Sequence, residues 1–147
     1  MREIRHAAVW LAAVLFFAVG AVWYTLLAEP WMAGIGKTRD QLMAQGGGPG
    51  VSYAVGFAAI VVLCYTLAWL VGRMGAASMA GGMRTGAALG IGLCSATIAL
   101  NYAFELRPVS LWLINAGFVT LGLALAGAIV GGWRRRTVTL QPRAAGA

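Results

Sequence analysis

Four long apolar stretches, separated by short segments that hold almost every charge, constrain this 147-residue chain more than any other feature. As helices that rise about 1.5 Å per residue, each is long enough to cross a hydrocarbon core of about 30 Å. The sequence therefore predicts an all-α membrane protein, a four-transmembrane-helix bundle within one domain at residues 1–133. The predicted spans are residues 6–27, 51–72, 84–104 and 110–132.

The composition agrees with a bundle that faces lipid. Charged residues make up 10% of the chain, whereas soluble domains average about 25%. Lipid tails cannot solvate charge, which explains this deficit. The net charge of +7 comes from basic residues at the ends of the spans, where they would meet anionic headgroups. These residues do not form a basic face interleaved with aromatics, so we expect the lipid bilayer as a partner and no nucleic acid.

The basic residues are divided unevenly between the two sides of the predicted bundle. Eight belong to the termini and the second connection, and three to the first and third connections. The positive-inside rule then predicts that both termini are cytoplasmic in a multi-pass protein of the cytoplasmic (inner) membrane. The eight are Arg2, Arg5, Arg73, Arg84, Arg134, Arg135, Arg136 and Arg143, and the three are Lys37, Arg39 and Arg107.

The two ends of the chain are predicted separately. The basic start followed by an apolar run is similar to a signal peptide, but the run is long and ends in Trp23 and Tyr24 instead of a small-residue cleavage site. We therefore expect a retained first helix. Residues 134–147 are basic and contain proline and alanine, which favours a disordered cytoplasmic tail.

The side opposite the termini is expected to carry an aromatic belt and a short helix. Thr38 and Gln41 have the spacing of a capping box, which predicts a short helix at the outer interface. Tyrosine and tryptophan favour the headgroup level of a membrane. The predicted outer belt consists of Trp23, Tyr24, Trp31, Tyr102 and Trp112.

The last two spans are predicted to form a tightly packed hairpin. The connection between them is short and centred near Pro108, so residues at equal depth have numbers with a constant sum. This arithmetic pairs Gly86 with Gly131 and Gly90 with Gly127. Small residues at four-residue spacing let helix backbones approach closely, so we expect the hairpin to pack along these four glycines.

The same arithmetic predicts two polar levels in the hairpin. It places Asn101 level with Asn115, and Thr97 level with Thr120. Depth does not fix how each helix is rotated, so that these pairs face one another is a hypothesis.

A polar cluster is predicted at the outer end of the hairpin. Asn101 and Glu105 share a helix face because they are four residues apart. Arg107, Asn115 and Glu29 would join them. Because a carboxylate near the membrane is costly unless it is paired or hydrated, the cluster is either a structural turn with polar contacts or a small-molecule or ion site open to the outside. Catalysis there is a third alternative.

No catalytic, metal or cofactor site is predicted. General acid–base chemistry usually needs a tuned acid and base together with a nucleophile or metal. The single histidine, His6, lies on the opposite side from the polar cluster. Cys64 and Cys94 fall near the middle of predicted spans, where a cysteine serves as a small apolar residue.

Several of these residues also carry a family resemblance. The tryptophan–tyrosine pair at residues 23–24, followed by EPWM at 29–32, is similar to one conserved region of domain-of-unknown-function family 1761, small four-span bacterial membrane proteins. NYAFELRP at 101–108, LINAG at 113–117 and the segment 127–133 resemble a second region. The resemblance covers nearly the whole chain and implies a four-span fold, but it implies no activity.

Two functions are compatible with these observations. The favoured hypothesis is a non-enzymatic integral membrane protein that binds a small ligand, a lipid or a partner protein through the outer polar cluster. The alternative is a small transporter or channel, assembled as an oligomer. Against transport, no predicted span carries a charge near its middle.

Overall fold

The computed structural model describes residues 4–44, 48–76 and 78–133, and this part of the chain is helical apart from short connections. The predicted tail at 134–147 lies outside the described residues. The elements are α1 (His6–Leu26), α2 (Ala28–Ile35), α3 (Arg39–Ala44), α4 (Gly48–Arg73), α5 (Met79–Leu89), the π-helical turn η1 (Gly90–Ser95), α6 (Ala96–Phe104) and α7 (Val109–Gly132).

Four helical rods are long and apolar enough to cross a membrane, which confirms the predicted fold class. They are His6–Leu26, Gly50–Arg73, Met79–Phe104 and Val109–Gly132, and the third joins α5, η1 and α6. The third rod begins five residues before the predicted span, because Ser78 caps it. The Oγ of Ser78 accepts a hydrogen bond from the backbone N–H of Gly81 at 3.0 Å, as N-cap serines typically do.

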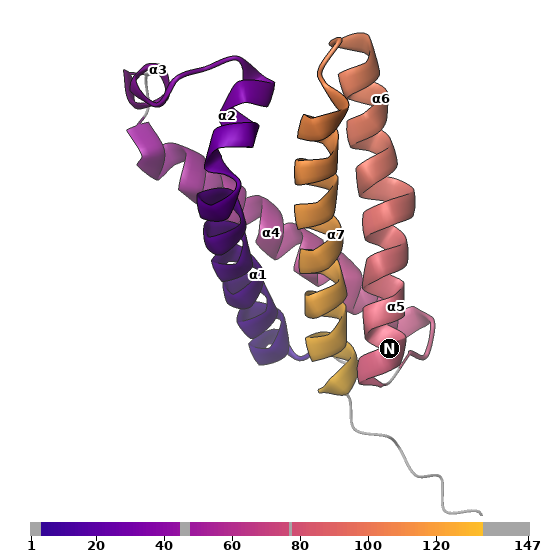
Figure 1. The fold of residues 1–147 in the computed structure, drawn as a ribbon. Helices are drawn as coiled ribbons and strands as arrows, with labels where there is room; N and C mark the ends of the chain where they lie inside the picture. Colours follow the sequence, from indigo (N-terminus) through magenta and orange to yellow (C-terminus); the bar gives the residue numbers. More distant parts are fainter. Residues whose placement is uncertain (1–3, 45–47, 77, 134–147) are drawn as a thin grey trace, which may run out of the picture.

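Helix α7 lies at the centre of the bundle (Figure 1). It stands between α1 and the α5–α6 rod, and α4 crosses diagonally behind. The start of α1 and the end of α7 lie at one end of the bundle, here called the terminal end. Helices α2 and α3 and the α6–α7 turn lie at the opposite end, here called the α2–α3 end.

The core is a layer of apolar side chains between α1, α4 and α7. Phe16, Leu67 and Leu123 are fully buried there, and Cys64 is buried among them as the small apolar residue that the sequence predicts. Large apolar side chains also cover much of the outer surface, such as Val62, which is 64% exposed. In a bilayer such side chains face lipid tails, so the exposed apolar surface is that of a spanning bundle.

Helices α5 and α7 touch through their backbones. A Cβ on Gly82 or Gly86 would collide with the main chain of α7, and one on Gly127 or Gly131 with the main chain around Gly82. All four glycines are buried. The structure thus places all four predicted glycines at the contact between the third and fourth spans, since Gly90 is also buried and lies against the backbone of Thr120. Gly82 belongs to the same contact and was not predicted.

The predicted pairing of these glycines is wrong by one helical turn. Gly82, not Gly86, lies against Gly131, and Gly90 lies against Thr120, not Gly127. The reason is the position of the turn. Pro108 is the N-cap of α7 and not the centre of the connection, which lies between Phe104 and Val109.

The α6–α7 turn begins with a left-handed residue. Leu106 has φ 54°, the backbone N–H of Arg107 donates to the carbonyl of Tyr102 at 3.0 Å, and the N–H of Leu106 donates to that of Ala103 at 3.4 Å. These two bonds close the Schellman motif that often ends a helix. They fix the end of α6 at Phe104 and therefore set the register of the hairpin.

Helix α3 confirms the predicted capping box. The backbone N–H of Gln41 donates to Oγ1 of Thr38 at 3.3 Å, and the N–H of Thr38 donates to Oε1 of Gln41 at 2.9 Å. Gly36, with φ 68°, ends α2 in the left-handed conformation that glycine adopts without strain. After this turn the chain runs to α3, whose first residue, Arg39, lines a hollow together with residues at the start of α2.

Candidate functional site

A half-buried chain of hydrogen bonds joins three helices at the α2–α3 end. The hydroxyl of Tyr24 in α1 donates to Oδ1 of Asn115 in α7 at 2.7 Å. Nδ2 of Asn115 donates to the hydroxyl of Tyr102 in α6, also at 2.7 Å. The rings of Trp31 and Phe118 stack edge-on against Tyr24. These side-chain hydrogen bonds link α1, α7 and α6, so they stabilise the contact between spans.

The π turn η1 makes a second polar level. Ser95 and Thr120 hydroxyls lie 3.3 Å apart, and the indole N–H of Trp112 donates to the carbonyl of Ser95 at 3.0 Å. Trp23 similarly donates to the carbonyl of Ile114 at 3.0 Å. The predicted belt residues are therefore half-buried, and the polar atoms of four of them bond to protein groups.

The predicted polar pairs are wrong because η1 contains one extra residue. In a regular α-helix Asn101, eleven residues after Gly90, would return to nearly the same face after three turns. With a π turn the residue that returns is Tyr102, because a π turn is wider than an α turn. Asn115 consequently bonds to Tyr102, and Asn101 is exposed with no side-chain hydrogen bond among the described residues. For the same reason Ser95, not Thr97, meets Thr120.

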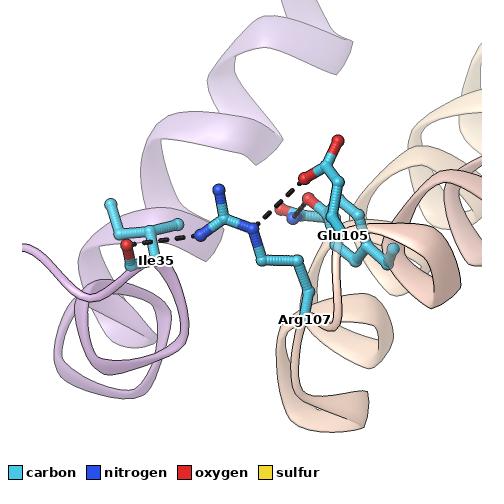
Figure 2. Close-up of polar contacts among 5 residues, drawn as sticks. Ile35, Glu105 and Arg107 are labelled. Carbon is cyan, nitrogen blue, oxygen red and sulfur yellow. Dashed lines mark hydrogen bonds and ion pairs between the residues drawn. The ribbon is translucent and has the colours of Figure 1, made fainter.

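Glu105 and Arg107 form an exposed ion pair at the α6–α7 turn. Nε of Arg107 lies 3.2 Å from Oε2 of Glu105, with side chains about half exposed. Figure 2 shows the guanidinium of Arg107 reaching across to the helix that ends at Ile35, whose carbonyl accepts a hydrogen bond at 3.4 Å. This contact ties the α6–α7 turn to α2. The carboxylate of Glu105 pairs with Arg107, as the structural-turn alternative requires, and among the described residues it makes no bond to the side chain of Asn101 or Asn115.

Glu29 lies apart from the other predicted cluster residues, in an open hollow of about 440 Å³ where α1 ends. Arg39 from α3 lines the same hollow. The Glu29 carboxylate and the Arg39 guanidinium are not within ion-pair distance of each other, and the ion pair found among the described residues is Glu105–Arg107. The remaining lining residues are Thr25, Leu26, Ala28, Pro30 and Met32.

Two residues of these sites were not predicted from the sequence. Tyr102 was assigned to the aromatic belt, and only the phase of α6 after η1 brings its hydroxyl to Asn115. Arg39 was counted only for topology, ten residues from Glu29. The left-handed residue Gly36 between α2 and α3 was the one available signal that the chain folds back there.

The hollow combines a carboxylate that accepts hydrogen bonds, from Glu29, with a guanidinium that donates them, from Arg39. Within residues 4–44, 48–76 and 78–133, no group of histidine, cysteine and acidic residues could hold a metal. His6 lies at the terminal end, where its Nδ1 is 2.9 Å from the hydroxyl of Tyr65.

These features define a class: a polytopic membrane protein with four helical spans and a partly charged hollow at one end. The particular family follows from comparison with known proteins. Residues 7–131 match the family described as protein of unknown function DUF1761, and the chain belongs to it. No curated protein and no solved structure matches the chain.

Proposed function

We propose that this protein is a non-enzymatic integral membrane protein that binds a small amphiphilic ligand at its α2–α3 end. The observation that carries the proposal is the hollow where α1 meets α2 and α3. It combines two side chains of opposite charge, Glu29 and Arg39, with the apolar side chains of Leu26 and Met32. Ligand sites typically join apolar walls to a few charged or polar groups in this way.

The frame of the hollow is held from three directions. Trp31 of α2 stacks on Tyr24, whose ring centroid lies 5.7 Å away. Gly34 of α2 lies against Leu111 of α7, and Arg107 bonds to the carbonyl of Ile35. Of the residues predicted to form the site, Glu29 lines the hollow, whereas Arg107 and, through Tyr24, Asn115 support α2.

The orientation is part of the proposal. Eight basic residues belong to the terminal side and three to the opposite side, so we place both termini in the cytoplasm and the hollow outside. Reporter fusions at the C-terminus test this placement. Activity of a reporter that works only in the periplasm would contradict it.

The alternative of a small oligomeric transporter or channel is less favoured. A transport pathway needs polar groups open to water within the spans. The polar side chains at the Tyr24–Asn115–Tyr102 level bond to one another, and no described buried side-chain polar atom lacks a partner.

Filling the hollow tests the proposal. Ala28→Trp places an indole among the lining residues, and Ala33→Trp on the exposed side of α2 is the matched control. Each variant is purified in detergent with defined lipids, and retained lipid is counted by native mass spectrometry. We expect Ala28→Trp to lose a bound lipid that wild type and Ala33→Trp both keep. Equal retention by all three proteins would contradict the proposal.

A further inference from the structure

We propose that the hollow recognises a zwitterionic phosphoethanolamine headgroup of a lipid, with its ammonium at Glu29 and its phosphodiester at Arg39. This inference rests on the proposed function and names the chemical class of the ligand.

The charges of the hollow call for a ligand with two opposite charges. An ionised carboxylate only accepts hydrogen bonds, and a guanidinium only donates them. Glu29 and Arg39 line one hollow without pairing with each other. A purely anionic ligand would satisfy Arg39 but meet repulsion from Glu29, and a purely cationic ligand would do the reverse. An ammonium joined to a phosphodiester satisfies both groups.

The two charged side chains also suit these partners chemically. The planar guanidinium of arginine matches the oxygens of a phosphate with parallel hydrogen bonds. A primary ammonium has three N–H donors, so it can bond to a carboxylate directly, whereas a quaternary ammonium cannot. Ethanolamine therefore fits Glu29 better than choline does.

The apolar side of the hollow continues along the lipid-facing surface of α1. Leu26 lines the hollow and is 76% exposed, and Val22, one turn before it on the same face, is 60% exposed. An acyl chain attached to a headgroup in the hollow could follow these two side chains into the bilayer. A lipid is thus favoured over free phosphoethanolamine, which has no group for this surface.

The experiment uses the full chain, delipidated in detergent and titrated with phosphatidylethanolamine or phosphatidylglycerol, with retained lipid counted by native mass spectrometry. We expect wild type to retain one phosphatidylethanolamine in preference to phosphatidylglycerol. Glu29→Gln should lower phosphatidylethanolamine retention about tenfold without lowering that of phosphatidylglycerol, because a charged hydrogen bond is lost. Arg39→Gln should lower retention of both lipids.

Two neighbouring charges provide matched controls. Asp40→Asn and Lys37→Gln remove the same charges from residues that do not line the hollow. We expect both variants to retain phosphatidylethanolamine as wild type does. Unchanged retention in Glu29→Gln, or an equal loss in Asp40→Asn, would overturn the assignment of the ammonium to Glu29.

Other outcomes separate this inference from the proposed function. Suppose that wild type retains both lipids equally, that Ala28→Trp loses both, and that Glu29→Gln changes the retention of neither. Recognition of a zwitterionic headgroup is then refuted, and the proposed binding function stands. If wild type retains no lipid, both fail. Soluble glycerophosphoethanolamine should not displace the lipid at equal concentration, and equal displacement would refute a lipid as the source of the headgroup.

Discussion

The contact between the third and fourth spans has two halves that are built differently. Towards the terminal end, α5 and α7 touch through glycine backbones at Gly82, Gly86 and Gly127. Towards the α2–α3 end, α6 and α7 are joined by hydrogen bonds from long side chains, with Tyr102 reaching Asn115. The π turn η1 lies between these halves.

The difference teaches that helical spacing predicts contacts only while the helix stays regular. Gly82 and Gly86 of α5 are four residues apart, and both face α7. Beyond η1 the face is displaced by one residue, so that Tyr102 replaces Asn101. The π turn therefore divides the contact into two halves. The residues that face α7 follow from sequence spacing before the turn, and they do not after it.

Single-residue deletions are expected to have the largest effect on how the two halves face α7. Deleting Leu93, which is exposed within η1, converts the π turn into an α turn and keeps both halves facing α7. Deleting Leu121, which is 49% exposed within α7, where no wide turn can absorb the change, rotates the Asn115 half of α7 by about 100° relative to the Gly127 half. We expect the Leu93 deletion to fold and the Leu121 deletion to aggregate, as judged by size-exclusion chromatography in detergent. Similar behaviour of the two variants would contradict this account of η1.

Alanine at Gly86 is the next largest expected effect. Its Cβ would meet the backbone of Leu123, which cannot move aside as a flexible side chain can. We expect Gly86→Ala to lower the free energy of unfolding by at least about 3 kcal/mol, at the upper end of overpacking costs. Titration with dodecyl sulfate measures this change.

Gly92→Ala is the control for that variant, because nothing lies within 4 Å of its Cβ position. We expect it to be neutral or stabilising by up to about 1 kcal/mol, since alanine is the better helix former. Equal destabilisation by the two substitutions would show that the α5–α7 contact is not as close as described.

Substitutions of two asparagines test which residues form contacts in the half beyond η1. Asn115→Ala removes both hydrogen bonds to Tyr24 and Tyr102, and we expect a loss of about 1–3 kcal/mol. Asn101→Ala removes an exposed side chain without a hydrogen bond and should change stability by less than about 0.5 kcal/mol. The same unfolding titration ranks the two, and a larger effect at Asn101 would contradict the displaced face.

The smallest effect is expected at the α6–α7 turn. The Glu105–Arg107 pair is about half exposed, so Glu105→Gln should lower stability by less than about 1 kcal/mol. Arg107→Gln should cost more, because it also removes the bond to the carbonyl of Ile35 that holds α2. Thermal unfolding of both variants in detergent tests this order, and a larger loss in Glu105→Gln would reverse it.

The candidate site was only partly predictable. The sequence predicts one cluster of Glu29, Asn101, Glu105, Arg107 and Asn115. The structure instead places Glu29 in the hollow, Glu105 and Arg107 at the exposed turn and Asn115 in the half-buried network, and it leaves Asn101 exposed. Arg39 enters the hollow because the chain reverses at Gly36, a tertiary consequence of one left-handed residue. Charge counting alone could not place it there.

The sequence by itself determined the four spans, because the requirement of lipid for apolar side chains adds up along the chain and does not depend on rotation. It also determined the capping box of α3, which is a contact between near neighbours. Only the tertiary structure decided which residues face one another. Facing depends on helical phase and on where a turn is centred, and a single extra residue in η1, or Pro108 acting as an N-cap, changes both.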